Sequence, residues 1–180
     1  RRALAFVTSA YSSYSGCRQY REDIERARAE VGAAAPLVEK LRPFFNHPGF
    51  IEAVVGRVQE ALESVSADCR TQTQLVFTAH SIPIAMSNGC RYAEQLRESC
   101  SLVADRVGQL PWTLTFQSRS GSPSQPWLEP DICDWLREFS QRGERTNVVV
   151  IPIGFISDHV EILFDLDHEA RSIANACGLQ

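Results

Sequence analysis

Three carboxylates recur four positions apart near the end of the chain, at Glu161, Asp165 and Glu169. If this segment is a helix, residues four apart lie on one face, so the acids form a single column. Like charges at this spacing repel by about 0.2–0.5 kcal/mol per exposed pair, and by more when they are buried. Such a column either faces water or binds a cation. His159 precedes it, and imidazole with carboxylate is the ligand chemistry of Fe²⁺, Co²⁺ and Zn²⁺.

Helix capping is the competing interpretation of the same acids. Asp158 and Glu161 fit the Asp-x-x-Glu form of a capping arrangement, and acids in a first turn suit the helix dipole. Capping does not explain Asp165 or Glu169, which lie deeper in the helix. The spacing alone leaves both interpretations open.

His80 is a second candidate for acid-base or metal chemistry. It closes the apolar run from Leu75 to Ala79 and is followed by Ser81. One interpretation is an imidazole that only makes a structural hydrogen bond at a strand end. The other is a base or metal ligand facing a cleft, where a neutral imidazole accepts protons near physiological pH. A Ser–His hydrolase is the weaker alternative, because His80 and Ser81 are adjacent and no Gly-x-Ser-x-Gly turn joins a strand to a helix.

Hydrophobic periodicity predicts alternating strands and helices along the chain. Strands are expected at residues 3–9, 74–79, 113–117 and 147–153, and helices at residues 18–30, 50–65, 90–107 and 130–142, with the acidic helix after the last strand. Near-continuous apolar strands separated by helices indicate a parallel sheet covered on both faces. We therefore expect an α/β fold.

Ligands of such sheets bind beyond the carboxyl ends of the strands, and several polar groups fall there. They occupy residues 11–15, 80–81 and 157–161. A Ser/Gly/Pro-rich loop at residues 117–127 can carry Trp127 to the same rim. Tryptophan in such a loop is most often a packing anchor, but a flat aromatic ligand would make it a wall.

Composition limits the class of protein. The chain has 180 residues, 44% of them hydrophobic, which is enough for a sizeable core. A net charge of −4 without a basic run argues against nucleic acid as a partner. No apolar stretch reaches the roughly 20 residues of a membrane span. Six cysteines without a Cys-x-x-Cys pair predict reduced thiols in a cytoplasmic protein. Because Arg1 falls inside a strand-like run, we expect a fragment without its N-terminal part.

Three motifs, in order and at the expected separations, resemble ferrochelatases. They are Phe77–Pro83, then Phe116–Arg119 with Pro126–Asp131, then Val150–Glu161. The resemblance covers the whole chain, which corresponds to the C-terminal part of the enzyme. The segment Tyr11–Arg18 is most similar to the actinobacterial branch, whose members insert iron into coproporphyrin III and often carry a [2Fe-2S] cluster.

The resemblance implies a chelatase-like, Rossmann-type parallel sheet flanked by helices. The second chelatase domain would be present with only the end of the first. Residues 1–65 would then be the end of the N-terminal half with its connecting helices, and residues 66–180 the C-terminal domain.

The resemblance also implies roles for the candidate site residues. His80 corresponds to the essential histidine, which takes pyrrole protons or binds the incoming iron, and Glu161 to the acid across the porphyrin. Asp165 and Glu169 would continue an acidic path along a helix that is locally widened. The metal-site candidates are therefore His80, Glu161, Asp165 and Glu169. Residues implied at the substrate are Tyr11, Ser12, Ser15, Trp127, Phe155 and His159. Cys17 matches the one cluster cysteine outside the family's C-terminal tail, so a cluster is expected only in the full-length parent.

The implied reaction is a lyase-class metal chelation in heme biosynthesis. Fe²⁺, as substrate, enters a porphyrin with release of two protons, and coproporphyrin III is favoured over protoporphyrin IX. Partners would be the porphyrin, ferrous iron and a downstream heme-synthesis enzyme that receives the product. Two alternatives stay open: a non-catalytic tetrapyrrole carrier, and a related cobalt or sirohydrochlorin chelatase. The central expectation is geometric, that His80 and Glu161 face each other across a gap wide enough for a planar ring.

Overall fold

Three parallel strands form the central sheet in the order β4-β3-β5. They are β3 (Gln74–His80), β4 (Trp112–Gln117) and β5 (Val148–Ile151). In this computed structural model, which describes residues 1–122, 124–143 and 146–180, every residue of β3 except His80 is buried. A fully buried strand is typical of a parallel sheet covered on both faces. The predicted α/β class is confirmed.

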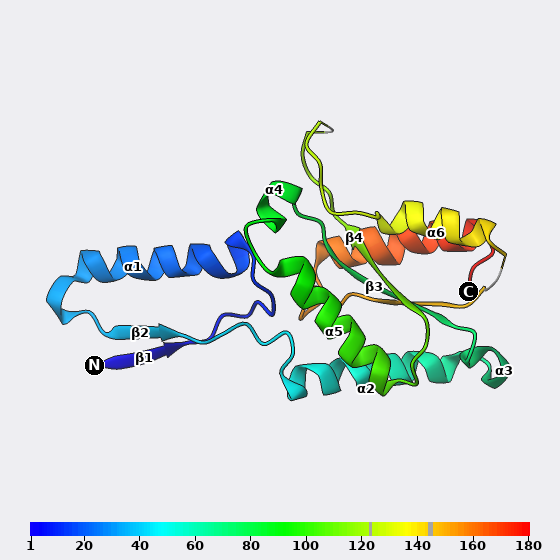
Figure 1. Cartoon of the computed structure of the whole chain (residues 1–180), viewed down its shortest axis with the longest axis horizontal. Coiled ribbons are helices and arrows are strands. Elements are labelled where there is room, and N and C mark those ends of the chain that lie inside the picture. Colours follow the sequence, from blue (N-terminus) through cyan, green and yellow to red (C-terminus); the bar gives the residue numbers. More distant parts are fainter. Residues whose placement is uncertain (123, 144–145) are drawn as a thin grey trace.

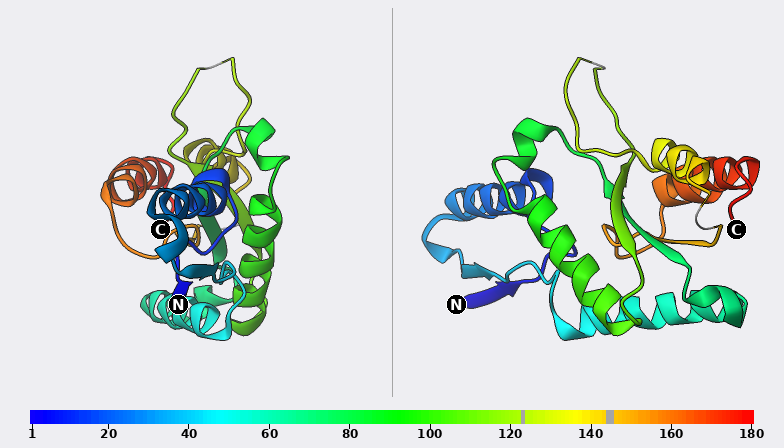
Figure 2. Two further views of the ribbon diagram at one scale, coloured as in Figure 1. Left: turned by 90° about the vertical axis from the view of Figure 1, so that its left-hand side faces the viewer. Right: turned by 45° about the vertical axis from the view of Figure 1, so that its right-hand side comes forward.

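Helices cover the two faces of this sheet (Figures 1 and 2). On one face lie α2 (Pro48–Ser64) and α5 (Tyr92–Arg106), and on the other α6 (Ile132–Gln141), the π-helix η3 (Ile162–Ala170) and α7 (Arg171–Ala176). Side chains of β3 alternate between the layers, as the two-residue period of a strand requires. Leu75 and Phe77 join the core under α2 and α5, whereas Val76 joins the core under α6 and η3.

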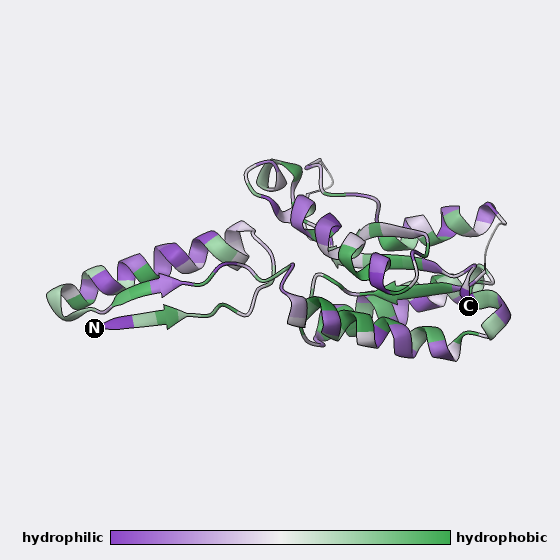
Figure 3. Ribbon diagram, turned by 60° about the horizontal axis from the view of Figure 1, so that its bottom comes forward, coloured by the Kyte–Doolittle hydropathy of each residue, from purple (hydrophilic) through white to green (hydrophobic). Residues whose placement is uncertain are grey.

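A second, two-stranded parallel sheet lies apart from the first (Figure 1). It pairs β1 (Arg2–Ala5) with β2 (Leu37–Lys40), and α1 (Gln19–Val31) runs beside it. No residue of α1 is buried, and Leu4 and Phe6 are 69% and 62% exposed. Figure 3 shows this arm extending from the larger body, with apolar residues on its strands.

Several boundaries differ from those predicted. Periodicity did not reveal β2, because four residues that alternate in burial give too short a signal. The same holds for α3 (Ala67–Arg70) and α4 (Ile84–Ser87), and for the short helical turns η1 (Tyr14–Arg18) and η2 (Gly32–Ala34). The strands predicted at 3–9 and 147–153 end earlier, at Ala5 and Ile151. Of the loop predicted at residues 117–127, position 123 lies outside the described residues.

The acidic segment after β5 forms a π-helix rather than a regular α-helix along Ile162–Ala170. Hydrogen bonds of a π-helix run from residue i to i+5, so each turn is wider than the α-helical turn on which the predicted column of acids depends. The locally widened helix implied by the resemblance is present. Such bulges are frequent at functional sites.

Candidate active site

His80 and Glu161 meet at the carboxyl edge of the central sheet. Nε2 of His80 lies 3.8 Å from Oε1 of Glu161, and the two side chains are 31% and 43% exposed. His80 comes from the last position of β3, and Glu161 from the residue before η3. The two groups therefore face each other and remain open to solvent.

The predicted gap between these two groups is absent. A planar ring between them would need about 3.5 Å of contact distance on each side, or roughly 7 Å in total. The observed separation is 3.8 Å. In this structure the two side chains face each other without that gap, and the position of a porphyrin relative to them stays a prediction.

A backbone contact fixes the tautomer of His80. Nδ1 lies 2.5 Å from the carbonyl oxygen of Ser81. A carbonyl only accepts hydrogen bonds, so Nδ1 carries the proton, and Nε2 of the neutral ring is left as the acceptor. Nε2 is also the atom that faces Glu161. The lone pair available for a proton or a metal ion thus points at the carboxylate.

A second imidazole stands on the other side of Glu161. Nδ1 of His159 lies 3.9 Å from Oε2 of Glu161 and accepts a hydrogen bond of 3.3 Å from the Glu161 amide. The His159 ring packs edge-on against Phe155, with centroids 4.5 Å apart. His159 rather than Asp158 therefore binds the Glu161 amide, which corrects that part of the capping interpretation. The carboxylate of Glu161 stands between two imidazoles.

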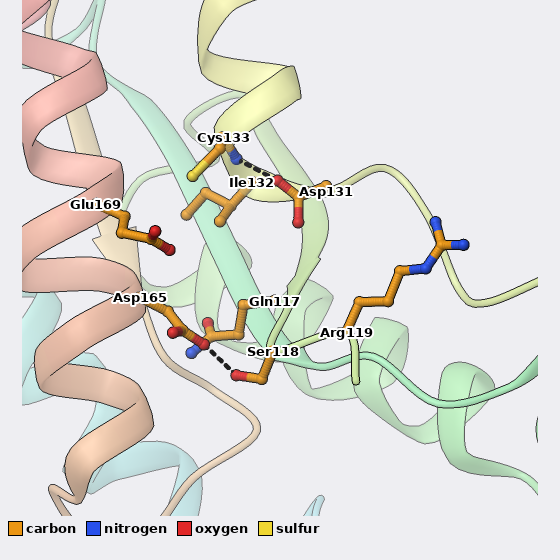
Figure 4. Close-up of a pocket in the computed structure, with 8 residues that line it drawn as sticks. All are labelled: Gln117, Ser118, Arg119, Asp131, Ile132, Cys133, Asp165 and Glu169. Carbon is orange, nitrogen blue, oxygen red and sulfur yellow. Dashed lines mark hydrogen bonds between the residues drawn. The ribbon is translucent and has the colours of Figure 1, made fainter. Parts of the chain in front are cut away.

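Asp165 and Glu169 line a hollow (Figure 4) whose lining includes neither His80 nor Glu161. The hollow measures about 220 Å³ and lies between η3, the end of β4 and the start of α6. The Ser118 hydroxyl donates a hydrogen bond to Asp165. The residues that line the hollow are Gln117, Ser118, Arg119, Asp131, Ile132, Cys133, Asp165 and Glu169. Glu161 is not among them, so the three acids do not form one column around one site.

Gln117 belongs to this hollow but was not among the predicted site residues. It pairs with His80 in the sheet register and is 1% exposed. Its side-chain oxygen accepts a 2.7 Å hydrogen bond from Thr78, whereas Nε2 has no hydrogen-bond partner among the described residues. Its place at the end of a strand, level with His80, is the sequence signal that could have identified it.

The predicted substrate-binding residues are distributed unevenly. Phe155 and His159 lie at the His80–Glu161 contact. Tyr11 is 2% exposed, and its hydroxyl donates a 3.0 Å hydrogen bond to the Ile153 carbonyl. Trp127 is 7% exposed and pairs with Pro83, just beyond His80. Direct contact of either buried ring with a substrate requires a rearrangement and stays a prediction.

The two predicted serines lie in the segment before α1. The amide of Ser12 donates a 2.8 Å hydrogen bond to the side-chain oxygen of Gln95 in α5, and Gln95 returns a bond of 3.0 Å to the Ser12 hydroxyl. Ser15 lies on the surface within η1. Ser12 therefore joins this segment to α5, and substrate contact by either serine stays a prediction.

Cys17 alone does not make a cluster site. It lies half-buried in η1, and the Lys40 ammonium donates to its sulfur across 3.5 Å. An iron–sulfur cluster needs four ligands. Among the described residues, no group of three or more His, Cys, Asp or Glu side chains is arranged to hold a metal ion. The residues present do not fit a cluster, and Cys17 as a ligand stays a prediction for the full-length parent.

The Cys133 thiol offers a direct check of the hollow. Burial, and then the negative charges of Asp131 and Glu169, raise the pKa of this thiol to about 11. We expect iodoacetamide to alkylate Cys133 slowly near neutral pH, with a rate that rises until about pH 11, because the thiolate is the nucleophile. Glu169→Gln should shift this profile to lower pH. The rates can be followed by mass spectrometry of the Cys133 peptide.

Glu138→Gln supplies the matched control for this measurement. It removes an exposed negative charge from α6, the helix that carries Cys133, and should leave the alkylation profile unchanged. A Cys133 profile that levels off near pH 9, or one that Glu169→Gln does not move, would contradict the arrangement of the hollow.

Within the part of the chain that the structure describes, no helix combines the length and the apolar character needed to cross a membrane.

Comparison with known proteins places the chain in a family. A sequence model of the ferrochelatase family matches residues 1–180. The chain is 54% identical to a ferrochelatase of Rhodopirellula baltica, over all of this chain and 51% of that protein. It is 49% identical to the coproporphyrin III ferrochelatase of Nocardia farcinica, over 98% of this chain and 52% of that protein, and 45% identical to that of Streptomyces coelicolor, over 99% and 52%. The chain thus spans about half the length of the curated relatives it matches, and it belongs to the ferrochelatase family.

Proposed function

We propose that the full-length protein containing this chain inserts Fe²⁺ into a porphyrin with release of two protons. The observation that carries the proposal is the 3.8 Å contact between Nε2 of His80 and Oε1 of Glu161, in a chain of the ferrochelatase family. The contact joins a proton acceptor to an anion at the open edge of a parallel sheet, where ligands of such folds bind.

His80 accepts the pyrrole protons in this proposal. Its Nδ1 hydrogen bond to Ser81 leaves Nε2 free to accept, and Glu161 beside it stabilises the imidazolium that forms. Glu161 then takes the proton onward, or joins His80 in holding the incoming Fe²⁺, because imidazole and carboxylate together suit this ion. The macrocycle lies beside the pair rather than between its members.

In this proposal, the hollow lined by Asp165 and Glu169 attracts Fe²⁺ toward the site and carries released protons away. Asp165 and Glu169 line it one and two turns beyond Glu161 along the same helical segment. Their charges attract a hydrated divalent ion, and their repulsion is relieved when an ion or a proton arrives. The Ser118 hydroxyl holds Asp165 in place at the mouth of this route.

Coproporphyrin III is the proposed substrate in preference to protoporphyrin IX. Support comes from the relatives in Nocardia farcinica and Streptomyces coelicolor, which are named for coproporphyrin III. The reaction would take place in the cytoplasm, consistent with six unpaired cysteines, and its product would pass to a downstream enzyme of heme synthesis.

Residues 1–65 are proposed to complete the other half of the full-length protein. The sheet β1–β2 has only two strands and leaves Leu4, Phe6 and Leu37 exposed. Two strands alone rarely make a stable sheet in water. The remaining half of the full-length protein would add strands and bury these side chains.

Anaerobic metallation of coproporphyrin III and protoporphyrin IX, followed by absorbance, tests the proposed reaction with the full-length protein. We expect Fe²⁺ to enter both rings faster than in buffer, and coproporphyrin III faster than protoporphyrin IX. If neither ring is metallated faster than in buffer, the proposed function fails. Faster Co²⁺ insertion into sirohydrochlorin would favour the related chelatase instead.

Glu161→Gln separates an enzyme from a tetrapyrrole carrier. The amide keeps the size of the side chain but loses the charge that stabilises an imidazolium or a cation. We expect metallation to slow by roughly 10–100-fold, while porphyrin binding, measured by fluorescence quenching, stays the same. Asp167→Asn is the matched control, since Asp167 pairs with Arg171 on the exposed side of the same helix. Unchanged metallation in Glu161→Gln would favour a carrier.

A further inference from the structure

A buried tyrosine holds the backbone of His80. The Tyr92 hydroxyl, at the first position of α5, donates a 3.0 Å hydrogen bond to the His80 carbonyl. Tyr92 is 7% exposed. Strand β5 ends at Ile151, level with Phe77, so the sheet on that side no longer reaches His80. A buried carbonyl without a partner is costly, and Tyr92 supplies the missing donor.

A second buried tyrosine holds the segment that leads to Glu161. The Tyr11 hydroxyl donates a 3.0 Å hydrogen bond to the carbonyl of Ile153, which follows β5. The next residue, Gly154, packs directly on β3: a Cβ atom there would lie 2.5 Å from Cβ of Ala79, and its amide donates to Thr78. Tyr11 thus fixes the point from which the chain runs to His159 and Glu161.

The two tyrosines are in contact with each other. Their rings meet edge-on, with centroids 6.0 Å apart and planes at 84°. Both belong to the core beneath α2 and α5. Burial raises the pKa of both phenols well above the usual value, so both hydroxyls stay protonated and continue to donate wherever a histidine titrates.

We propose that Tyr92 and Tyr11 act together as positioning residues that set the separation of His80 Nε2 and Glu161 Oε1. Neither phenol touches that pair, so each acts through the backbone carbonyl that it holds. The inference rests on the proposed function, for which a correctly spaced base and acid are required. A displacement of about 1 Å in such a pair is enough to cost on the order of 10²-fold in rate.

Tyr92→Phe and Tyr11→Phe test this arrangement in the full-length protein, because they remove one hydroxyl each and leave the aromatic packing in place. We expect each to lower kcat for Fe²⁺ insertion by about 10-fold, with KM for the porphyrin unchanged. Each should also weaken Zn²⁺ binding that depends on His80, measured by competition with a zinc indicator and with His80→Ala as the reference. In the double variant, kcat should fall by less than the product of the two single fold-changes, because both hydroxyls set the same distance.

Tyr14→Phe is the matched control. Tyr14 is exposed, and its hydroxyl donates to Glu22 on the surface of α1. The change should therefore leave kcat and Zn²⁺ binding as they are. A merely structural role would lower the melting temperature of the Tyr92 and Tyr11 variants and leave kcat and Zn²⁺ affinity within two-fold of the parent, and that result would overturn the inference.

The Zn²⁺ measurement separates this inference from the proposed function. If the parent protein fails to metallate porphyrin but Tyr92→Phe still weakens His80-dependent Zn²⁺ binding, the proposed reaction is wrong and the positioning role stands. If Zn²⁺ binding does not depend on His80, or both tyrosine variants bind Zn²⁺ as the parent does, the positioning role is wrong.

Discussion

Replacing His80 with alanine in the full-length protein should lower the rate of Fe²⁺ insertion into porphyrin by roughly 10²–10⁴-fold. The reason is that Nε2 of His80 is the acceptor next to Glu161, and Nδ1 is already committed to the Ser81 carbonyl. Alanine removes both the proton acceptor and one side of the proposed metal-binding pair. The rate is measured anaerobically by absorbance, at saturating porphyrin.

His168→Ala is the control for this experiment. His168 lies on η3, the helix that follows Glu161, but its side chain is exposed. It stacks on Phe164 with ring centroids 5.5 Å apart. Its loss should leave metallation unchanged. Added imidazole should restore part of the activity of His80→Ala, since a free base can enter the vacated space. An activity of His80→Ala within a few-fold of the parent would show that another group takes the protons.

Phe77→Ala should lower the free energy of unfolding by about 3–5 kcal/mol. Phe77 lies at the middle of the central strand, is completely buried, and contacts Trp112 edge-on at 5.9 Å. Truncation leaves a cavity between the sheet and the layer formed by α2 and α5. Urea unfolding followed by tryptophan fluorescence gives the change.

Phe164→Ala provides the comparison with the same substitution on the surface. Phe164 is 53% exposed on η3, so its truncation should change the free energy of unfolding by less than about 1 kcal/mol. If the two phenylalanine variants lose the same free energy of unfolding, Phe77 does not lie in the core as described.

The strands that carry the site could be predicted from sequence because their signal is strong. β3 is an uninterrupted apolar run that ends in one polar residue, and this pattern located both the central strand and His80 at its open end. The apolar face of α2 gave that helix within two residues at either end. By contrast, β2 has four residues and alternating burial, and nothing in its composition distinguishes it from a linker.

The geometry of the site could be predicted only in part. The sequence indicated that His80 and Glu161 would meet, since both follow strands of one parallel sheet. It did not reveal that their atoms lie only 3.8 Å apart, because the path of the chain from Ile153 to Glu161 decides that distance. The family resemblance also implied that Tyr11 would lie by the substrate, whereas packing against Tyr92 and Phe45 encloses it. Long-range packing of this kind leaves no local pattern.

In the proposed reaction, the 3.8 Å separation of His80 and Glu161 limits the order of events. One nitrogen lone pair cannot hold a proton and a ferrous ion at the same moment. If the macrocycle lies beside the pair, as proposed, deprotonation and iron delivery would compete for the same position and would have to alternate. The catalytic cycle would then be stepwise, with the imidazole cleared of its proton before the ion is admitted.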